Sequence, residues 1–325
     1  MRHAARNGWV CVACVAAAWA AAAADGDAPG AEQGATVPAE SAEPLEEIVV
    51  RAPEPRYVAP TRRDQIGRIW APVYINEKGP FRLVLDTGAT RSGVVATVAA
   101  ALGLMPDANA QVMIQGVTGA APVSTIKVSS LIVGDVQMNG SRLPILADAL
   151  GGAEGILGTE GLADRRVFID FRNDLIIISR SHSQGAPPHF VTVPFRLEHG
   201  RMVAEVSVGL VRAKAIIDTG GQSSVANLAL RNALRRRVSA HPQMDDIQGV
   251  TQDVEQGEWL AAPPIGFGPI EIRTGHLSFA DLSIFRHWRL TSEPAMLIGM
   301  DALGLLDTLI IDYRRQELQL LLAHG

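Results

Sequence analysis

The sequence predicts an all-β protein of two tandem, pseudo-symmetric lobes with minor helices. Apolar or alternating runs of five to seven residues, separated by Gly, Pro, Asn and Asp, dominate the chain, which is typical of strands. A set of short motifs also occurs twice in the same order, which indicates an internal repeat. Strand patterns lie at Ser129–Val133, Leu175–Ile178, Val191–Phe195 and Leu318–Leu322, and helical patterns at Val95–Leu102, Ala226–Arg237 and Met300–Leu305.

The first 24 residues predict a secretory signal peptide. A basic start is followed by the apolar stretch Val10–Ala24, which is too short for a comfortable membrane span and ends in small residues that suit cleavage near Ala24. We therefore expect a periplasmic or secreted protein with no membrane span after signal cleavage. Both cysteines lie in this segment, so the mature chain would have no disulfide. A lipoprotein anchored through Cys14 is the alternative.

Residues 25–65 are expected to form a disordered linker, because Ala, Pro, Glu and Gly dominate and few large apolar residues occur. One apolar island, Ile48–Val50, resembles the short box by which outer-membrane receptors engage an energy-transducing partner through strand addition. The alternatives are a chance β-prone stretch and an edge strand of the first lobe.

The rest of the chain divides into two lobes, at residues 66–181 and 190–325. The break falls near Gln184–Pro188, where Gly and Pro interrupt regular structure. A net charge of −5 argues against a nucleic-acid partner. The eight histidines have no metal-ligand spacing, so we expect no metal and no cofactor.

The repeat is anchored by two Asp-Thr-Gly strings, each of which follows an apolar, β-branched run. Asp86 and Asp218 lie 132 residues apart. A strand pattern precedes each string, and three landmarks follow it in the same order. These are Gln115–Gly119 and Gln248–Gln252, then Gly155–Gly158 and Met296–Gly299, and finally Phe168–Arg172 and Ile310–Arg314. Five landmarks that recur in one order predict two copies of one fold.

A strand that ends in Asp-Thr-Gly presents a carboxylate on a tight turn, where Gly88 and Gly220 can adopt backbone angles that a side chain would forbid. Two such turns that face each other would give a carboxylate pair able to share a proton and activate water. Asp170 and Asp312 also recur, but beside aromatic residues and arginines. We expect them to be structural, capping a turn or pairing with a neighbouring arginine.

Each half resembles a retropepsin-type aspartic protease lobe, and the pair resembles the two-lobed arrangement of pepsin-like enzymes, most of all bacterial periplasmic proteins. The resemblance covers roughly residues 66 to 322. It implies an endopeptidase that acts on an extended peptide or protein, with Asp86 and Asp218 as catalytic residues. The supporting residues of the two active-site loops would be Thr87, Gly88, Thr219 and Gly220. The flaps that close over substrate would include Gly116, Val117, Thr118, Gly249, Val250 and Thr251.

Two departures from the family pattern stand out. Gly221 and Gln222 replace the usual Ala or Ser and short polar residue after the second Asp-Thr-Gly. Neither flap has the tyrosine typical of pepsins, which favours a retropepsin-like flap. Two alternatives to a single-chain protease follow: a catalytically inactive, retropepsin-like peptide-binding module, and an enzyme whose lobes pair between two chains.

Overall fold

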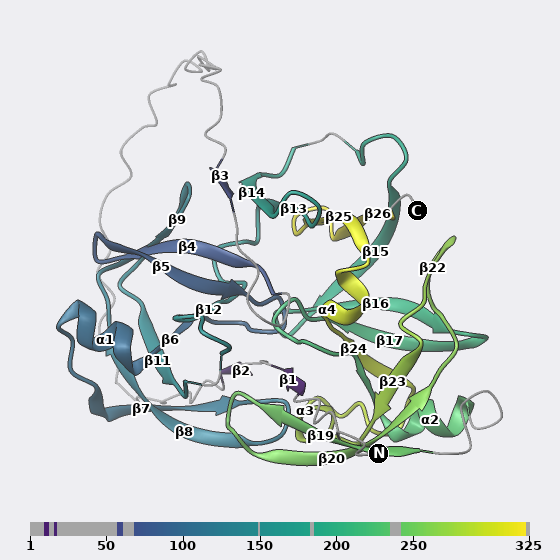
Figure 1. The fold of residues 1–325 in the computed structure, drawn as a ribbon. Helices are drawn as coiled ribbons and strands as arrows, with labels where there is room; N and C mark the ends of the chain where they lie inside the picture. Colours follow the sequence, from purple (N-terminus) through teal and green to yellow (C-terminus); the bar gives the residue numbers. More distant parts are fainter. Residues whose placement is uncertain are drawn as a thin grey trace, which may run out of the picture.

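The fold was analysed on a computed structural model of the 325-residue chain, which describes residues 10–12, 16–17, 57–60, 68–148, 150–182, 185–234 and 242–322. Strands dominate these residues, and two lobes lie side by side, which confirms the predicted fold class (Figure 1). We call residues 68–182 lobe 1 and residues 185–322 lobe 2. Most of the expected signal peptide and linker, including Ile48–Val50, lies outside the described residues.

Lobe 1 is a curled sheet in the order β10-β9-β4-β5-β12-β6-β11-β8-β7, with one helix packed on it. Its elements are β4 (Trp70–Ile75), β5 (Lys78–Leu85), β6 (Gly93–Val95), α1 (Ala96–Leu102), β7 (Asp107–Gln115), β8 (Ala120–Lys127), β9 (Ser130–Val133), β10 (Val136–Asn139), β11 (Arg142–Leu146) and β12 (Gly155–Leu157). In β4 burial alternates along the strand, so one face packs on the core; β12 is buried throughout.

Lobe 2 repeats this plan, with its sheet in the order β19-β20-β23-β18-β24-β17-β16. Its elements are β16 (Arg201–Val208), β17 (Val211–Ile217), β18 (Val225–Ala226), α2 (Leu228–Leu234), β19 (Gln243–Gly249), β20 (Val254–Ala261), β21 (Ile265–Phe267), β22 (Ile270–Ile272), β23 (His276–Phe279), α3 (Ser283–His287), β24 (Ala295–Ile298) and α4 (Met300–Leu303). The helical patterns of the sequence correspond to α1, α2 and α4, whereas α3 was not expected. It lies in the connection between β23 and β24, which is longer than the equivalent connection of lobe 1, so the repeat gives no indication of it.

A shared sheet joins the lobes. Its strands run in the order β3-β14-β13-β25-β26-β15, and β13 of lobe 1 pairs antiparallel with β25 of lobe 2, Phe168 opposite Ile310. The strands are β3 (Tyr57–Pro60), β13 (Arg165–Asp170), β14 (Leu175–Arg180), β15 (Val191–Glu198), β25 (Leu306–Asp312) and β26 (Glu317–Leu322). The main apolar core accordingly contains residues of both lobes, such as Ile169 and Ile311.

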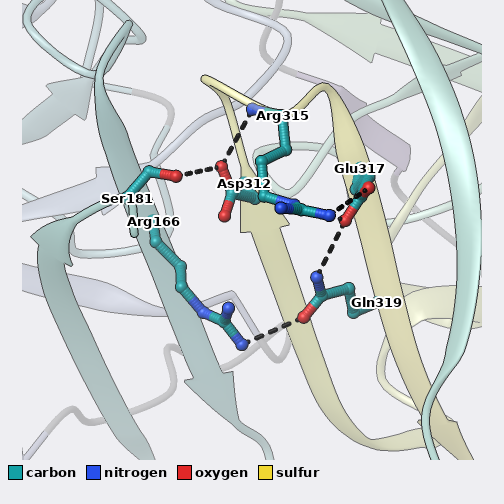
Figure 2. A network of polar contacts seen from close by, with 6 residues as sticks. All are labelled: Arg166, Ser181, Asp312, Arg315, Glu317 and Gln319. Carbon is teal, nitrogen blue, oxygen red and sulfur yellow. Dashed lines mark hydrogen bonds and ion pairs between the residues drawn. The ribbon is translucent and has the colours of Figure 1, made fainter. Parts of the chain in front are cut away.

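Side-chain contacts across this sheet are shown in Figure 2. Arg166 of lobe 1 donates to Oε1 of Gln319 at 2.9 Å, and the hydroxyl of Ser181 donates to the buried carboxylate of Asp312 at 2.7 Å. Asp312 also accepts from the backbone N–H of Arg315 at 3.0 Å, so it caps its own turn as expected. Asp170 caps the corresponding turn of lobe 1 by accepting from two backbone N–H groups.

Two short N-terminal strands lie along the hairpins at the bottom of Figure 1. β1 (Val10–Val12) pairs in parallel with residues 247–249 of β19, and β2 (Ala16–Ala17) pairs antiparallel with residues 114–115 of β7. Each of these two strands therefore adds to a hairpin of a different lobe, and both strands belong to the expected signal peptide.

Candidate active site

The two Asp-Thr-Gly loops occupy equivalent places, at the ends of β5 and β17. Each of these strands has a parallel neighbour, β12 in lobe 1 and β24 in lobe 2. The backbone N–H of Asp86 donates to Leu157 O, and that of Asp218 donates to Ile298 O, both at 2.9 Å. The apolar segment that precedes Gly158 or Gly299 thus fixes the point at which each aspartate leaves its strand.

Both aspartate side chains are fully buried and are held in the same way. Oδ1 of Asp86 accepts from the N–H groups of Gly88 (2.8 Å) and Ala89 (3.0 Å). Oδ1 of Asp218 accepts from those of Gly220 (3.0 Å) and Gly221 (2.9 Å). The unusual Gly221 therefore leaves the geometry of the second loop unchanged, since only its backbone is used.

The loops approach each other closely at the carboxylates. A Cβ atom on Gly220 would lie 2.3 Å from Cγ of Asp86, so no side chain fits at this position. The pKa of Asp86 is raised well above its usual 3.8, first by burial and next by the negative charge of Asp218. A side-chain hydrogen bond with Asp218 raises it further, whereas the N–H groups of Gly88 and Ala89 oppose the shift. The arrangement favours a pair of carboxyl groups that holds a proton.

The two threonines lock the loops together across the lobe boundary. The hydroxyl of Thr87 donates to Ile217 O (2.7 Å) and accepts from the N–H of Thr219 (3.1 Å). In the mirror contact, the hydroxyl of Thr219 donates to Leu85 O (2.5 Å) and accepts from the N–H of Thr87 (3.1 Å). All of these groups are buried, so the loops have little freedom to separate.

The predicted flap residues lie at the tips of two hairpins, β7–β8 and β19–β20. The tips touch: the N–H of Gly249 donates to the hydroxyl of Thr118 at 3.0 Å, and Gly116 faces Thr251. Val117 and Val250 are fully buried. The structure therefore brings both sets of predicted flap residues together.

A second layer of polar residues behind the loops was missed in the sequence. Ser92 and Ser224, each six residues after its aspartate, accept the N–H groups of Gly158 (3.0 Å) and Gly299 (3.1 Å). A partly buried carboxylate follows each of these glycines by two residues. The pKa of Glu160 and that of Asp301 are both raised, first by burial. The repeat itself holds this signal, because all four residues recur at matching positions.

Two further buried residues lie near the loops, and the repeat places Arg201 at the position equivalent to Arg68 and Phe171 at the position equivalent to Tyr313. Arg68 donates to Leu150 O at 2.5 Å and to Gly220 O at 3.4 Å, so it connects lobe 1 to the second loop. Tyr313 is buried, and its pKa is raised by burial and by the negative charge of Asp86. Its hydroxyl therefore stays neutral beside the pair.

Neither a metal cluster nor a membrane-spanning helix is found in the part of the chain that the structure describes. No three His, Cys, Asp or Glu side chains of these residues are grouped as metal ligands would be. None of their helices is both long and apolar enough to cross a bilayer.

Comparison with known families agrees with the geometry. Residues 71–160 match the family model described as aspartyl protease. This segment contains Asp86, the first flap and Gly158, so the resemblance predicted from the sequence is confirmed there: this part of lobe 1 is similar to an aspartyl protease domain. Lobe 2 lies outside the matched segment. No curated protein matches the chain.

Proposed function

We propose that the chain is an aspartic endopeptidase that hydrolyses peptide bonds with a water molecule activated between Asp86 and Asp218. The observation that carries the proposal is the buried pair itself, formed by two interlocked loops in which the pKa of Asp86 is raised by burial and by Asp218. The aspartyl protease family of lobe 1 supports the same reaction class.

In the proposed reaction the pair holds one proton. The ionised carboxylate takes a proton from water, whose oxygen attacks the scissile carbonyl carbon while the protonated carboxyl donates to the carbonyl oxygen. The tetrahedral intermediate then collapses as a proton passes to the amide nitrogen and the carbon–nitrogen bond breaks. Thr87 and Thr219 are not nucleophiles, because their hydroxyls are engaged with the opposite loop.

The open edges of the flap hairpins favour an extended peptide as the substrate. β1 and β2 already pair with β19 and β7, which indicates that these hairpins have edges open to strand addition. A bound peptide would pair with the same edges while the flap tips exclude water from above the carboxylates.

Cleavage of a mixed peptide library, measured from acid to neutral pH, tests the proposal. Asp86→Asn and Asp218→Asn should each lower kcat/KM by about 10³-fold or more, and the double variant should be little worse, because the pair acts as a unit. Asp148→Asn, at an exposed aspartate outside both loops, is the matched control. A transition-state mimic with a hydroxyl at the scissile position should bind the wild type tightly and both single variants weakly.

Two outcomes would overturn this function. Full activity of Asp218→Asn beside an inactive Asp86→Asn would make lobe 2 a scaffold. A folded wild type that cleaves nothing but binds extended peptides would favour the peptide-binding module.

We further propose that the protein is exported, with its leader removed near Ala24. N-terminal sequencing of the protein recovered from the cell envelope or medium should begin close to Asp25. Recovery of an intact Met1 in the cytosol would contradict export.

A further inference from the structure

A cavity of about 510 Å³ lies between the lobes, beside the two Asp-Thr-Gly loops. On the lobe 1 side it is lined by Thr90, four residues after Asp86; on the lobe 2 side it is lined by Ile216, two residues before Asp218. The cavity therefore lies close to the place where a peptide bound over the two carboxylates would lie.

The lining of the cavity has an excess of positive charge. Two arginines, Arg201 and Arg289, line it against a single carboxylate, Glu198, and the imidazoles of His199 and His287 complete its polar lining. The negative charge of Glu198 also acts on Lys214, since it is among the causes that raise the pKa of that lysine, after the hydrogen bond that Lys214 donates to Glu293. An anionic side chain is the ligand that this distribution favours.

Arg201 is the largely buried charged side chain of the cavity lining. Its side chain is largely buried, with the residue 8% exposed, and the guanidinium carbon lies 4.5 Å from the centroid of the Trp288 ring. A guanidinium stacked by its face directs its N–H groups along its edge, in the geometry that a carboxylate accepts through two parallel hydrogen bonds. The pKa of His287 is lowered, first by burial and then by the charge of Arg201, which places this imidazole in the same positive field.

This cavity is formed by an extension that lobe 1 lacks. Residues 280–294 connect β23 to β24, include α3 and supply His287, Trp288 and Arg289, whereas the equivalent connection of lobe 1 spans only residues 147–154. The same extension holds the first flap, because the N–H of Ile284 donates to Val117 O at 3.0 Å. A side chain in the cavity would thus lie next to the element that keeps the flap closed.

We propose that this cavity is a subsite that selects peptide substrates with an aspartate or glutamate near the scissile bond, held by Arg201. The inference rests on the proposed endopeptidase function. It adds the class of substrate.

The test uses matched peptides that differ only in Glu, Gln or Lys, placed in turn at each position around the scissile bond. At one position the Glu peptide should have a kcat/KM about tenfold or more above that of its Gln isostere, with Lys the poorest. This ratio should fall toward one in Arg201→Gln and partly in Arg201→Lys, which keeps the charge but loses the planar fork. Arg273→Gln, at an exposed arginine that does not line the cavity, should keep the full ratio.

Because Arg201 is buried, thermal unfolding checks that Arg201→Gln still folds. Arg289→Gln, at an exposed lining residue, provides a second variant expected to lower the ratio. A preference for Glu at no position, or one that these arginine variants leave unchanged, would overturn the subsite while cleavage itself still supports the protease. Fluorescence anisotropy with labelled peptides and Asp86→Asn separates the two claims. If the wild type cleaves nothing, tighter binding of the Glu peptide than of the Gln peptide would still support the subsite, and equal binding would refute it.

Discussion

The two lobes are nearly identical where they hold the aspartates and differ where a substrate would lie. In both, one carboxylate oxygen accepts two backbone N–H groups, and a serine supports the glycine behind the loop. On the lobe 1 side, however, Arg68 extends between Leu150 O and Gly220 O, whereas the lobe 2 side has the cavity lined by Arg201 and Trp288. The comparison teaches that the loops must match because they interlock, while the surroundings are free to diverge.

The largest effect that we expect concerns the paired aspartates, which the two lobes hold in the same way, and it is a change of stability with pH. The folded-state pKa of Asp86 is raised, so its contribution to stability is fully present below the unfolded-state pKa and is lost as pH rises through the folded-state value. Asp86→Asn removes this titration. Its free energy of unfolding should exceed that of the wild type at neutral pH, and the gain should shrink as pH falls toward 3.8. Urea unfolding at several pH values measures this gain in the free energy of unfolding. A variant less stable than the wild type at pH 7 would contradict repulsion between the two buried carboxylates.

The asymmetric part is tested by Arg68→Met, which fills similar space but cannot donate to Leu150 O or Gly220 O. Hydrogen bonds from a charged donor contribute about 1.5–3 kcal/mol each, so we expect a loss of about 3 kcal/mol. Arg273→Met, at an exposed arginine, should change the free energy of unfolding by less than about 0.5 kcal/mol. An equally small effect at Arg68 would mean that it does not connect the lobes energetically.

The mirrored hydrogen bonds of Thr87 and Thr219 predict that removing either hydroxyl lowers the free energy of unfolding by the same amount. Thr87→Ala and Thr219→Ala each leave a buried carbonyl and a buried N–H without their partner, which should lower the free energy of unfolding by about 2 kcal/mol. The Ser variants keep the hydroxyl and should lose less. Chemical denaturation of both pairs checks this, and a large loss at only one threonine would break the symmetry.

The smallest effect that we expect distinguishes the serines. Ser92→Ala and Ser224→Ala both remove the acceptor of a glycine N–H, at a cost of about 1 kcal/mol. Ser224→Ala should cost more, because its hydroxyl also donates to Asp301 at 2.7 Å. Thermal unfolding of the two variants side by side provides the measurement, and a larger loss at Ser92 would contradict the assignment.

Much of the fold around the aspartates could be predicted from the sequence because the same motifs occur twice in the same order. The offset between Asp86 and Asp218 located both loops, both hairpin tips and both bracing segments without any structure. Ser92 and Ser224 follow the same offset and could have been found in this way. A motif that depends on local backbone geometry leaves such a trace in the sequence.

The asymmetric parts leave no such trace. The partners of Arg68 are backbone oxygens 82 and 152 residues away, and a carbonyl has no sequence signature. The helix α3, Ser283–His287, lies in a connection that is longer than its equivalent in lobe 1, so the repeat gives no indication of it. The cavity needs this helix, the β15–β16 turn and Thr90 together, so only the folded chain brings its charges into one place.

The sheet shared by the lobes has a consequence for the order in which the protein is made. The strand that braces the second loop is residues 295–298, and the strand that receives lobe 1 is residues 306–312, of 325 in all. A chain that emerges from the ribosome N-terminus first can finish most of lobe 1 early, with β13 paired to β14, yet the other edge of β13 has no partner until β25 arrives. The braced carboxylate pair therefore requires residues 295–312, and a chain terminated before them would have neither a closed lobe boundary nor a second braced aspartate.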